Sequence, residues 1–185
     1  MNVTRASRPC ATPFARAGRP CHNVSNLIEI LQATPQDIPT IHAFIRGLAE
    51  YEKLTHQCVA TEQTLRETLF GSHRYAEVLI GKLDGEPAGF ALFFHNYSTF
   101  LAKPGIYLED LFVLPEHRGK GVGKALLVKL AQIARERNCG RLEWSVLDWN
   151  QPAIDFYQRL GAKVLQDWRI CRMTESEISN LANSK

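Results

Sequence analysis

The sequence has no long apolar run, no paired cysteines and no broad basic pattern. No stretch approaches the roughly 20 apolar residues that a membrane-spanning helix needs, so we expect no membrane insertion. The cysteines at positions 10, 21, 58, 139 and 171 form no C-x-x-C pair and no metal-ligand spacing. Their odd number and scatter argue against a disulfide framework. We therefore expect a reducing compartment, the cytoplasm, and no bound metal.

Acidic residues are missing from the start of the chain. Residues 1–28 contain four arginines and no Asp or Glu, and the rest of the chain holds 18 basic and 19 acidic residues. The overall charge of +3 therefore comes from this start and does not indicate nucleic-acid binding. Residues 1–25 lack periodicity and predict a disordered tail. Their Arg- and Ser-containing composition also resembles an organellar transit peptide, although prolines interrupt any amphipathic helix.

The remaining residues, 26–185, have enough apolar content for a single domain with one core. Hydrophobic periodicity and turn signals predict strands, helices and a closing pair of short strands. The expected strands are 27–31, 75–82, 88–94, 107–114, 141–147, 164–165 and 168–173. The expected helices are 35–51, capped by Thr34, then 62–70, 124–137 and a helix capped by Asn150 that runs through 158, with a short terminal helix opened by the capping box Thr174-x-x-Glu177. The order β-α-α-β-β-β-α-β-α-β predicts an α/β (α+β) fold, a mixed central sheet with helices on both faces.

A glycine-rich turn joins the strand at 107–114 to the next helix. Arg118 opens a run with glycine at positions 119, 121 and 123. Such glycines let backbone N–H groups converge on a ligand at a helix N-terminus, which favours a phosphate or pyrophosphate. A Walker loop is excluded because Lys124 is followed by Ala125, and a Rossmann fingerprint is excluded because position 124 is not glycine. An ordinary structural connection is the alternative.

Two adjacent carboxylates, Glu109 and Asp110, interrupt the apolar strand before this turn. Neighbouring strand residues point to opposite faces, so at most one is expected to enter a given face. A buried charge is costly unless it is paired or faces a solvated cleft. One interpretation is a partnered structural carboxylate. The other is a carboxylate that attracts a cationic amine and receives its proton, directly or through water.

A second motif, Asn150-x-x-Ala153-x-x-Phe156-Tyr157, follows the strand at 141–147. Its apolar spacing is that of a capped amphipathic helix, which is one interpretation. Together with the Arg118–Gly123 turn, it resembles the acyl-CoA site of the GNAT superfamily of N-acetyltransferases. In that superfamily the tyrosine protonates the departing CoA thiolate, which implies the same role for Tyr157.

The combination of motifs is similar to the diamine (spermidine/spermine) N-acetyltransferase family over about residues 27–173. The similarity lies in Leu48-Ala49-Glu50-Tyr51-Glu52, Tyr107–Val113, Arg118–Gly123 and Trp149-Asn150-x-Pro152. It implies a homodimer and acetyl-CoA as co-substrate. The implied polyamine-channel residues are Tyr51, Glu52, Glu109 and Asp110, with Asp148 as a neighbour. The implied CoA-binding residues are Leu111, Phe112, Val113, Arg118, Gly119, Lys120, Gly121, Val122, Gly123, Lys124, Asn150, Gln151, Pro152 and Ala153.

The sequence departs from that family at Asp148, where Glu is frequent, and at Leu111, where Phe is common. These departures concern the choice of amine, and relatives in the family acetylate thialysine or other amino-acid side chains. We expect direct attack of a primary amine on the thioester, with Glu109 as base through water and Tyr157 as acid. The alternatives are acetylation of a protein amine and a regulatory module that binds acyl-CoA without turnover.

Overall fold

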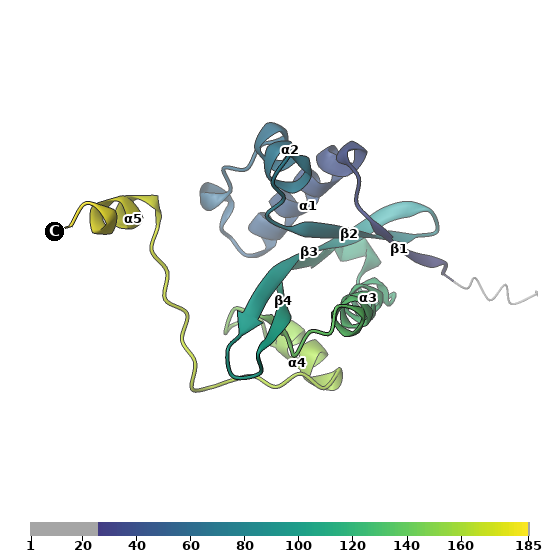
Figure 1. The fold of residues 1–185 in the computed structure, drawn as a ribbon. Coiled ribbons are helices and arrows are strands. Elements are labelled where there is room, and N and C mark those ends of the chain that lie inside the picture. Colours follow the sequence, from purple (N-terminus) through teal and green to yellow (C-terminus); the bar gives the residue numbers. More distant parts are fainter. Residues whose placement is uncertain (1–25, 185) are drawn as a thin grey trace, which may run out of the picture.

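A five-stranded sheet organises residues 26–184, the part of the chain that the computed structural model describes (Figure 1). Its strands, in spatial order, are β1 (Ile28–Gln32), β2 (Glu77–Leu83), β3 (Glu86–Ser98), β4 (Lys103–Val113) and β5 (Leu142–Trp144). All neighbours pair antiparallel except β4 and β5, which run parallel. The mixed sheet that the sequence predicts is therefore confirmed. No helix among these residues is long and apolar enough to cross a membrane.

Helices cover both faces of the sheet, as the sequence predicts (Figure 1). Helices α1 (Ile38–Tyr51) and α2 (Glu62–Phe70) pack on one face, and α3 (Val122–Glu136) and α4 (Gln151–Arg159) pack on the other. Neighbouring strand residues point to opposite faces of the sheet, so each strand contributes side chains to two hydrophobic cores. In β2, Val78 belongs to the core under α1 and its neighbour Leu79 to the core under α3. Full burial of a Val or Leu side chain stabilises the folded state by roughly 1.5–3 kcal/mol.

Strand β4 is interrupted where the carboxylates lie. Leu92 of β3 is opposite Asp110, and Phe93 is opposite Leu108, so Glu109 has no partner and forms a bulge. On its other side β4 pairs with β5 only over 106–108, and β5 ends at Trp144 rather than at the predicted residue 147. Beyond Leu108 the two strands separate. One edge of residues 109–113 is therefore left without a neighbouring strand in the described part of the fold.

The two closing strands predicted at 164–165 and 168–173 are not formed. This part of the chain runs extended away from the sheet and ends in α5 (Glu175–Ala182), which lies apart from the rest of the molecule (Figure 1). The prediction was wrong because a strand also needs a neighbouring strand to pair with, and the sequence pattern of a segment does not say whether one is in reach. The expected tail, residues 1–25, lies outside the described residues.

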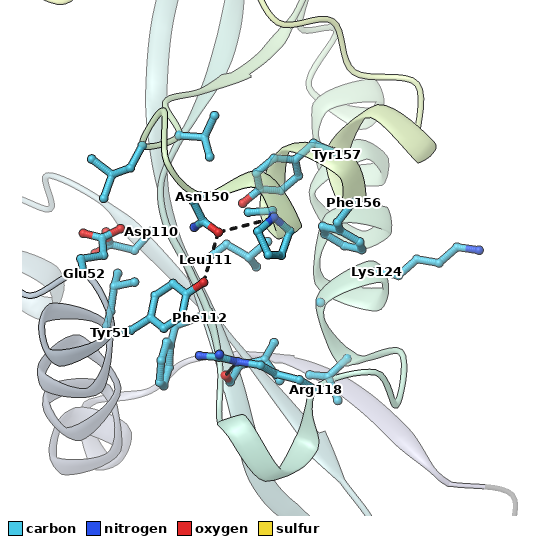
Figure 2. Close-up of a pocket in the computed structure, with 18 of the residues that line it drawn as sticks. Tyr51, Glu52, Asp110, Leu111, Phe112, Arg118, Lys124, Asn150, Phe156 and Tyr157 are labelled. Atoms are coloured by element: carbon cyan, nitrogen blue, oxygen red, sulfur yellow. Dashed lines mark hydrogen bonds between the residues drawn. The ribbon is translucent and has the colours of Figure 1, made fainter.

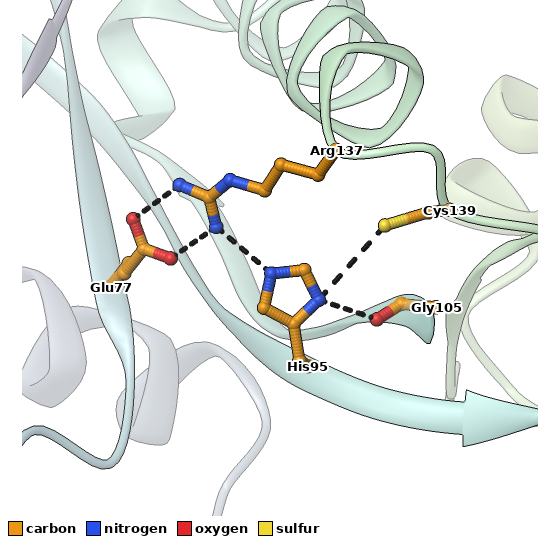
Figure 3. Close-up of polar contacts among 5 residues, drawn as sticks. All are labelled: Glu77, His95, Gly105, Arg137 and Cys139. Atoms are coloured by element: carbon orange, nitrogen blue, oxygen red, sulfur yellow. Dashed lines mark hydrogen bonds and ion pairs between the residues drawn. The ribbon is translucent and has the colours of Figure 1, made fainter. Parts of the chain in front are cut away.

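A polar cluster fastens the end of α3 to the sheet (Figure 3). Arg137 makes a bidentate ion pair with Glu77 of β2, and its Nη1 also lies 3.0 Å from Nε2 of His95. Because the guanidinium can only donate, Nε2 is the acceptor, and Nδ1 of His95 donates to the carbonyl oxygen of Gly105 at 3.0 Å. The thiol of Cys139 lies 3.9 Å from the same Nδ1.

We expect Glu77→Gln to destabilise the protein slightly and only above acidic pH. Hydrogen bonding and the charge of Arg137 lower the pKa of Glu77, so this stability is present above about pH 4.5 and is lost as the pH falls through the lowered value. Both side chains are about one-third exposed, which limits the effect to about 0.5–1 kcal/mol. Urea unfolding at pH 7 and pH 3 measures it. The exposed Glu86→Gln serves as control, and equal losses at both pH values would contradict this origin.

Candidate active site

A cavity of about 610 Å³ opens between α1, the separated end of β4, the start of α3 and the start of α4. All the site residues predicted from the sequence line it except Lys120, Asp148 and Gln151. The side chains of Lys120 and Asp148 are exposed. The side-chain amide of Gln151 instead donates to Asp155 at 2.6 Å within its own helix. The two motifs and the end of α1, far apart in sequence, are thus brought to one place.

Several lining residues were not predicted from the sequence. They are Leu48, His117, Ser145, Val146, Leu147, Phe156 and Arg159. A signal existed for Leu48, which lies four residues before Glu52 and so on the same helix face. Residues 145–147 were missed because the apolar run was interpreted as strand, whereas the strand stops at Trp144 and leaves them free to line the cavity.

Three carboxylates form one wall of the cavity: Glu52 from α1, with Glu109 and Asp110 from β4. The expectation that only one of the adjacent pair enters the cleft was wrong, because the bulge at Glu109 breaks the alternation. Figure 2 shows Glu52 and Asp110 side by side. Burial, with the charges of Glu109 and Glu52, raises the pKa of Asp110 to about 6, and burial also raises the pKa of Glu52.

The opposite end of the cavity offers unpaired backbone donors. Gly119 and Gly121 have φ of +75° and +96°, a region that side-chain-bearing residues rarely adopt. Ala125 makes the first hydrogen bond of α3, to Gly121 at 3.0 Å, so the amides just before it have no acceptor within the helix. These amides and the positive end of the helix dipole suit an anion such as a pyrophosphate.

Tyr51 connects three elements around the cavity (Figure 2). Its hydroxyl donates to Oδ1 of Asn150 at 3.1 Å, and the same oxygen accepts the backbone N–H of Ala153, capping α4. The guanidinium of Arg118 lies 4.5 Å from the centre of the Tyr51 ring, and its Nε donates to the carbonyl oxygen of Val113 at 3.1 Å. The end of α1, which carries Glu52, is thereby joined to the glycine-rich turn.

Tyr157 enters the cavity from α4. Its ring packs edge-on against Trp144 of β5, with 5.0 Å between the centroids, and its hydroxyl faces the cavity (Figure 2). Burial, together with Glu52 and Tyr51, raises the pKa of Tyr157 to about 12. The hydroxyl is therefore protonated at neutral pH and is available as a proton donor.

Comparison with known proteins assigns this arrangement to a family. Residues 41–162 match the model described as Acetyltransferase (GNAT) family. This chain belongs to the GNAT family. It is an N-acetyltransferase of the GNAT type, and the enzyme class and fold predicted from the sequence are confirmed.

Curated GNAT relatives cover most of the chain. An L-ornithine N5-acetyltransferase of Arabidopsis thaliana is 38% identical over 187 residues, covering 77% of this chain and 82% of that protein. A thialysine N-epsilon-acetyltransferase of Bos taurus is 37% identical, covering 84% of this chain and 97% of that protein. A human spermidine/spermine N(1)-acetyltransferase-like protein is 29% identical over 83% of this chain, which spans 24% of that protein.

Solved structures share the fold. A V. cholerae integron cassette protein superposes with a TM-score of 0.72 at 27% identity, covering 85% of this GNAT chain and 98% of its own. A ribosomal-protein-alanine N-acetyltransferase from Brucella melitensis gives a TM-score of 0.63 at 22% identity, covering 80% and 99%. At that identity the likeness concerns the fold alone.

Proposed function

We propose that this GNAT enzyme transfers the acetyl group of acetyl-CoA to a terminal primary amine of a small cationic molecule. The observation that carries the proposal is that one cavity gathers all the parts. An acidic wall made of Glu52, Glu109 and Asp110, a set of free backbone amides and the hydroxyl of Tyr157 all face it. An acidic wall attracts a cationic amine, and the amides suit the phosphates of a CoA thioester.

The glycine-rich turn and the residues around it fit CoA. The free amides of the glycine-rich turn and of the start of α3 would hold the pyrophosphate, and the cationic residues Arg118 and Lys124 line the same end of the cavity. The edge of β4 at 111–113, left without a neighbouring strand, would pair with the pantetheine chain and orient the thioester. Bound acetyl-CoA supplies the activated acetyl group.

The reaction needs a free amine, because a primary amine with a pKa of about 10 is mostly protonated at pH 7. The sequence favoured Glu109 as the base. We now favour Asp110, since Glu109 is exposed at the bulge whereas Asp110 is half-buried and its pKa of about 6 suits proton transfer near neutral pH. The amine forms the new N–C bond, and backbone N–H groups of 111–113 stabilise the charge that develops on the thioester oxygen. As the C–S bond breaks, Tyr157 protonates the thiolate, and the second proton of the attacking nitrogen passes to the tyrosinate, which restores the hydroxyl.

The named relatives differ in the amine that they acetylate, which bears on the substrate of this enzyme. The named relatives with 37–38% identity act on ornithine and thialysine, and the spermidine/spermine relative is more distant at 29%. We therefore place the side-chain amine of an ornithine- or thialysine-like amino acid first and a polyamine second. Both carry the positive charge that the wall of Glu52, Glu109 and Asp110 would attract.

Thiol release from acetyl-CoA with a panel of ornithine, thialysine, putrescine and spermidine tests the proposal. We expect kcat/KM to be highest for one of the two amino acids. A spermidine value above both would reverse the order of the two substrate classes. No release with any amine, in a protein that binds CoA, would contradict the proposed transfer and leave a binding module.

We also propose that the enzyme is a cytoplasmic homodimer. The cysteines of the described residues, Cys58, Cys139 and Cys171, are all free thiols, which suits a reducing compartment. The dimer is supported by large apolar side chains among residues 163–184, such as Trp168 and Ile170, which are more than half exposed in the single chain.

We expect Tyr51→Phe to raise the KM for both substrates with little change in kcat. The change removes the bond to Asn150 but keeps the ring under Arg118, and one lost side-chain bond costs about 1 kcal/mol, or roughly fivefold in kcat/KM. Steady-state kinetics with varied acetyl-CoA and varied amine measure it. Tyr75→Phe, on an exposed ring outside the cavity, is the control. An unchanged KM for acetyl-CoA would show that Tyr51 does not connect the two sides.

A further inference from the structure

A second cavity, of about 480 Å³, lies outside the active site. It is formed by the end of β1, the end of α2, the link between α2 and β2, the start of β2 and the end of β3, and it shares no lining residue with the first cavity. Its volume falls within the range of small-molecule sites, roughly 300–1,000 Å³. The proposed acetyl transfer uses none of its residues and so does not account for it.

The inner wall of this second cavity is apolar. Leu69 at the end of α2 and Val78 of β2 are almost fully buried, and Phe70 and Phe94 are half-buried beside the same space. Water in contact with such side chains is displaced favourably by an apolar group. The wall therefore suits a molecule with an apolar body.

The polar wall carries one charge without a partner. Glu77 and His95 line the cavity, but both oxygens of Glu77 are held by Arg137, and Nε2 of His95 accepts from the same guanidinium (Figure 3). Arg74 also lines the cavity and forms no ion pair with any residue in 26–184. Since the Glu77–Arg137 pair is neutral, the cavity keeps the single positive charge of Arg74.

The link that carries Arg74 has a fixed course. The backbone N–H of Gly71 donates to the carbonyl oxygen of Glu67 at 3.2 Å, and the N–H of residue 75 donates to that of Thr68 at 3.0 Å. The link is thus folded back on the last turns of α2. Because the backbone is already held, binding a ligand would order only the side chain of Arg74, which keeps the entropic cost low.

We propose that this second cavity binds a small carboxylate with an apolar body, such as an aryl-substituted acetate. The guanidinium of Arg74 would hold the carboxylate through two parallel hydrogen bonds, and the side-chain amide of Gln32, at the end of β1, would donate a third. The body would cover Leu69 and its apolar neighbours. A phosphate fits less well, because its charge exceeds that of one cation and it has no body to cover the apolar wall.

One hydrophobic core connects the second cavity to the active site. Leu69 and Val78 belong to the core under α1, and Leu48 and Tyr51, which line the active site, pack against the same core. Close-packed cores contain few voids and therefore transmit displacements. A ligand seated against Leu69 thus contacts the layer that carries Glu52, and its occupancy is positioned to alter binding of the amine.

Calorimetric titration of the full-length protein with phenylacetate tests the site. Saturating CoA is present, because the free amides of the glycine-rich turn could otherwise bind the probe. Phenylacetate should bind saturably. Phenylacetamide, which has the same shape without the charge, and acetate, which lacks the ring, should each bind about tenfold more weakly or less. Binding of phenylacetamide as tight as that of phenylacetate, or no saturable binding of phenylacetate, would overturn the proposal.

Two variants assign the charge that the probe uses. Arg74→Gln should weaken phenylacetate binding by about tenfold or more, since it removes a charged and bidentate donor. Arg66→Gln, at an exposed position of α2 that lines neither cavity, is the matched control and should bind as the wild type does. Circular dichroism checks that both remain folded. Wild-type affinity in a folded Arg74→Gln protein would contradict the site.

NMR of the ¹⁵N-labelled, CoA-bound protein locates the probe. Phenylacetate should shift backbone amide signals of residues 32–33, 69–78 and 94–95, whereas shifts confined to the active-site cavity would overturn the second site. Thiol release with and without phenylacetate adds a kinetic readout. A change in the amine KM that Arg74→Gln abolishes would support the connection through the core. A protein that binds phenylacetate but transfers no acetyl group would refute the proposed function and leave this site standing.

Discussion

Tyr157→Phe is expected to lower kcat by at least about 100-fold, the lower end of what a positioned acid contributes. Only the hydroxyl oxygen is removed, and the ring keeps its edge-on contact with Trp144, so the fold and the cavity should remain. The departing thiolate would then take its proton from water. Stopped-flow or steady-state thiol release with saturating amine measures the loss.

The pH profile adds a second readout for Tyr157. Since its pKa is raised to about 12, the hydroxyl remains protonated through pH 10, and the wild type should show no fall in kcat from this group below that pH. Tyr75→Phe, on an exposed ring outside the cavity, is the matched control and should keep full turnover. A folded Tyr157→Phe protein with wild-type kcat would remove Tyr157 from the chemistry.

Local motifs allowed much of this site to be predicted from the sequence. The glycines at 119 and 121 are required by the backbone conformation of their own turn, and Asn150 caps its own helix, so each leaves a signal within a few residues. The family match confirms the fold and the enzyme class that these motifs suggested. The paired carboxylates were also recognised, because charges in an apolar strand stand out.

What the sequence could not supply depends on pairing between distant strands. The bulge at Glu109 exists only in relation to Leu92 and Phe93 of β3, so no local pattern indicated that both carboxylates would line the cavity. The same holds for Trp168 to Met173, which have strand character but pair with none of the described strands. Alternation of apolar and polar residues indicates that a segment can form a strand, but whether it does depends on a neighbouring strand with which it can pair.

Asp110→Asn is expected to lower kcat/KM by about 100-fold or more and to remove the acidic limb of the pH profile. In the wild type kcat/KM should rise through pH 6 as Asp110 ionises, because only the carboxylate can accept the proton of the amine. Glu52→Gln should shift that limb to lower pH, since the charge of Glu52 is one of the causes that raise the pKa of Asp110. Glu109→Gln tests the other candidate base. A larger loss there, with the limb retained in Asp110→Asn, would return the role to Glu109.

The same substitution should make the protein more stable, which separates a functional carboxylate from a structural one. The folded pKa of about 6 lies above the ordinary 3.8, so ionised Asp110 destabilises the native state above pH 6 and has no such effect below about pH 4. The difference between the folded and the ordinary pKa corresponds to about 3 kcal/mol of unfolding free energy. Asp110→Asn should therefore raise the free energy of unfolding by up to that amount at pH 8 and should leave it unchanged at pH 4. Urea unfolding at both pH values measures it, with Asp167→Asn at an exposed position outside the cavity as control. A stability loss at pH 8 would mean that Asp110 has a partner that holds its charge, and that the carboxylate is structural after all.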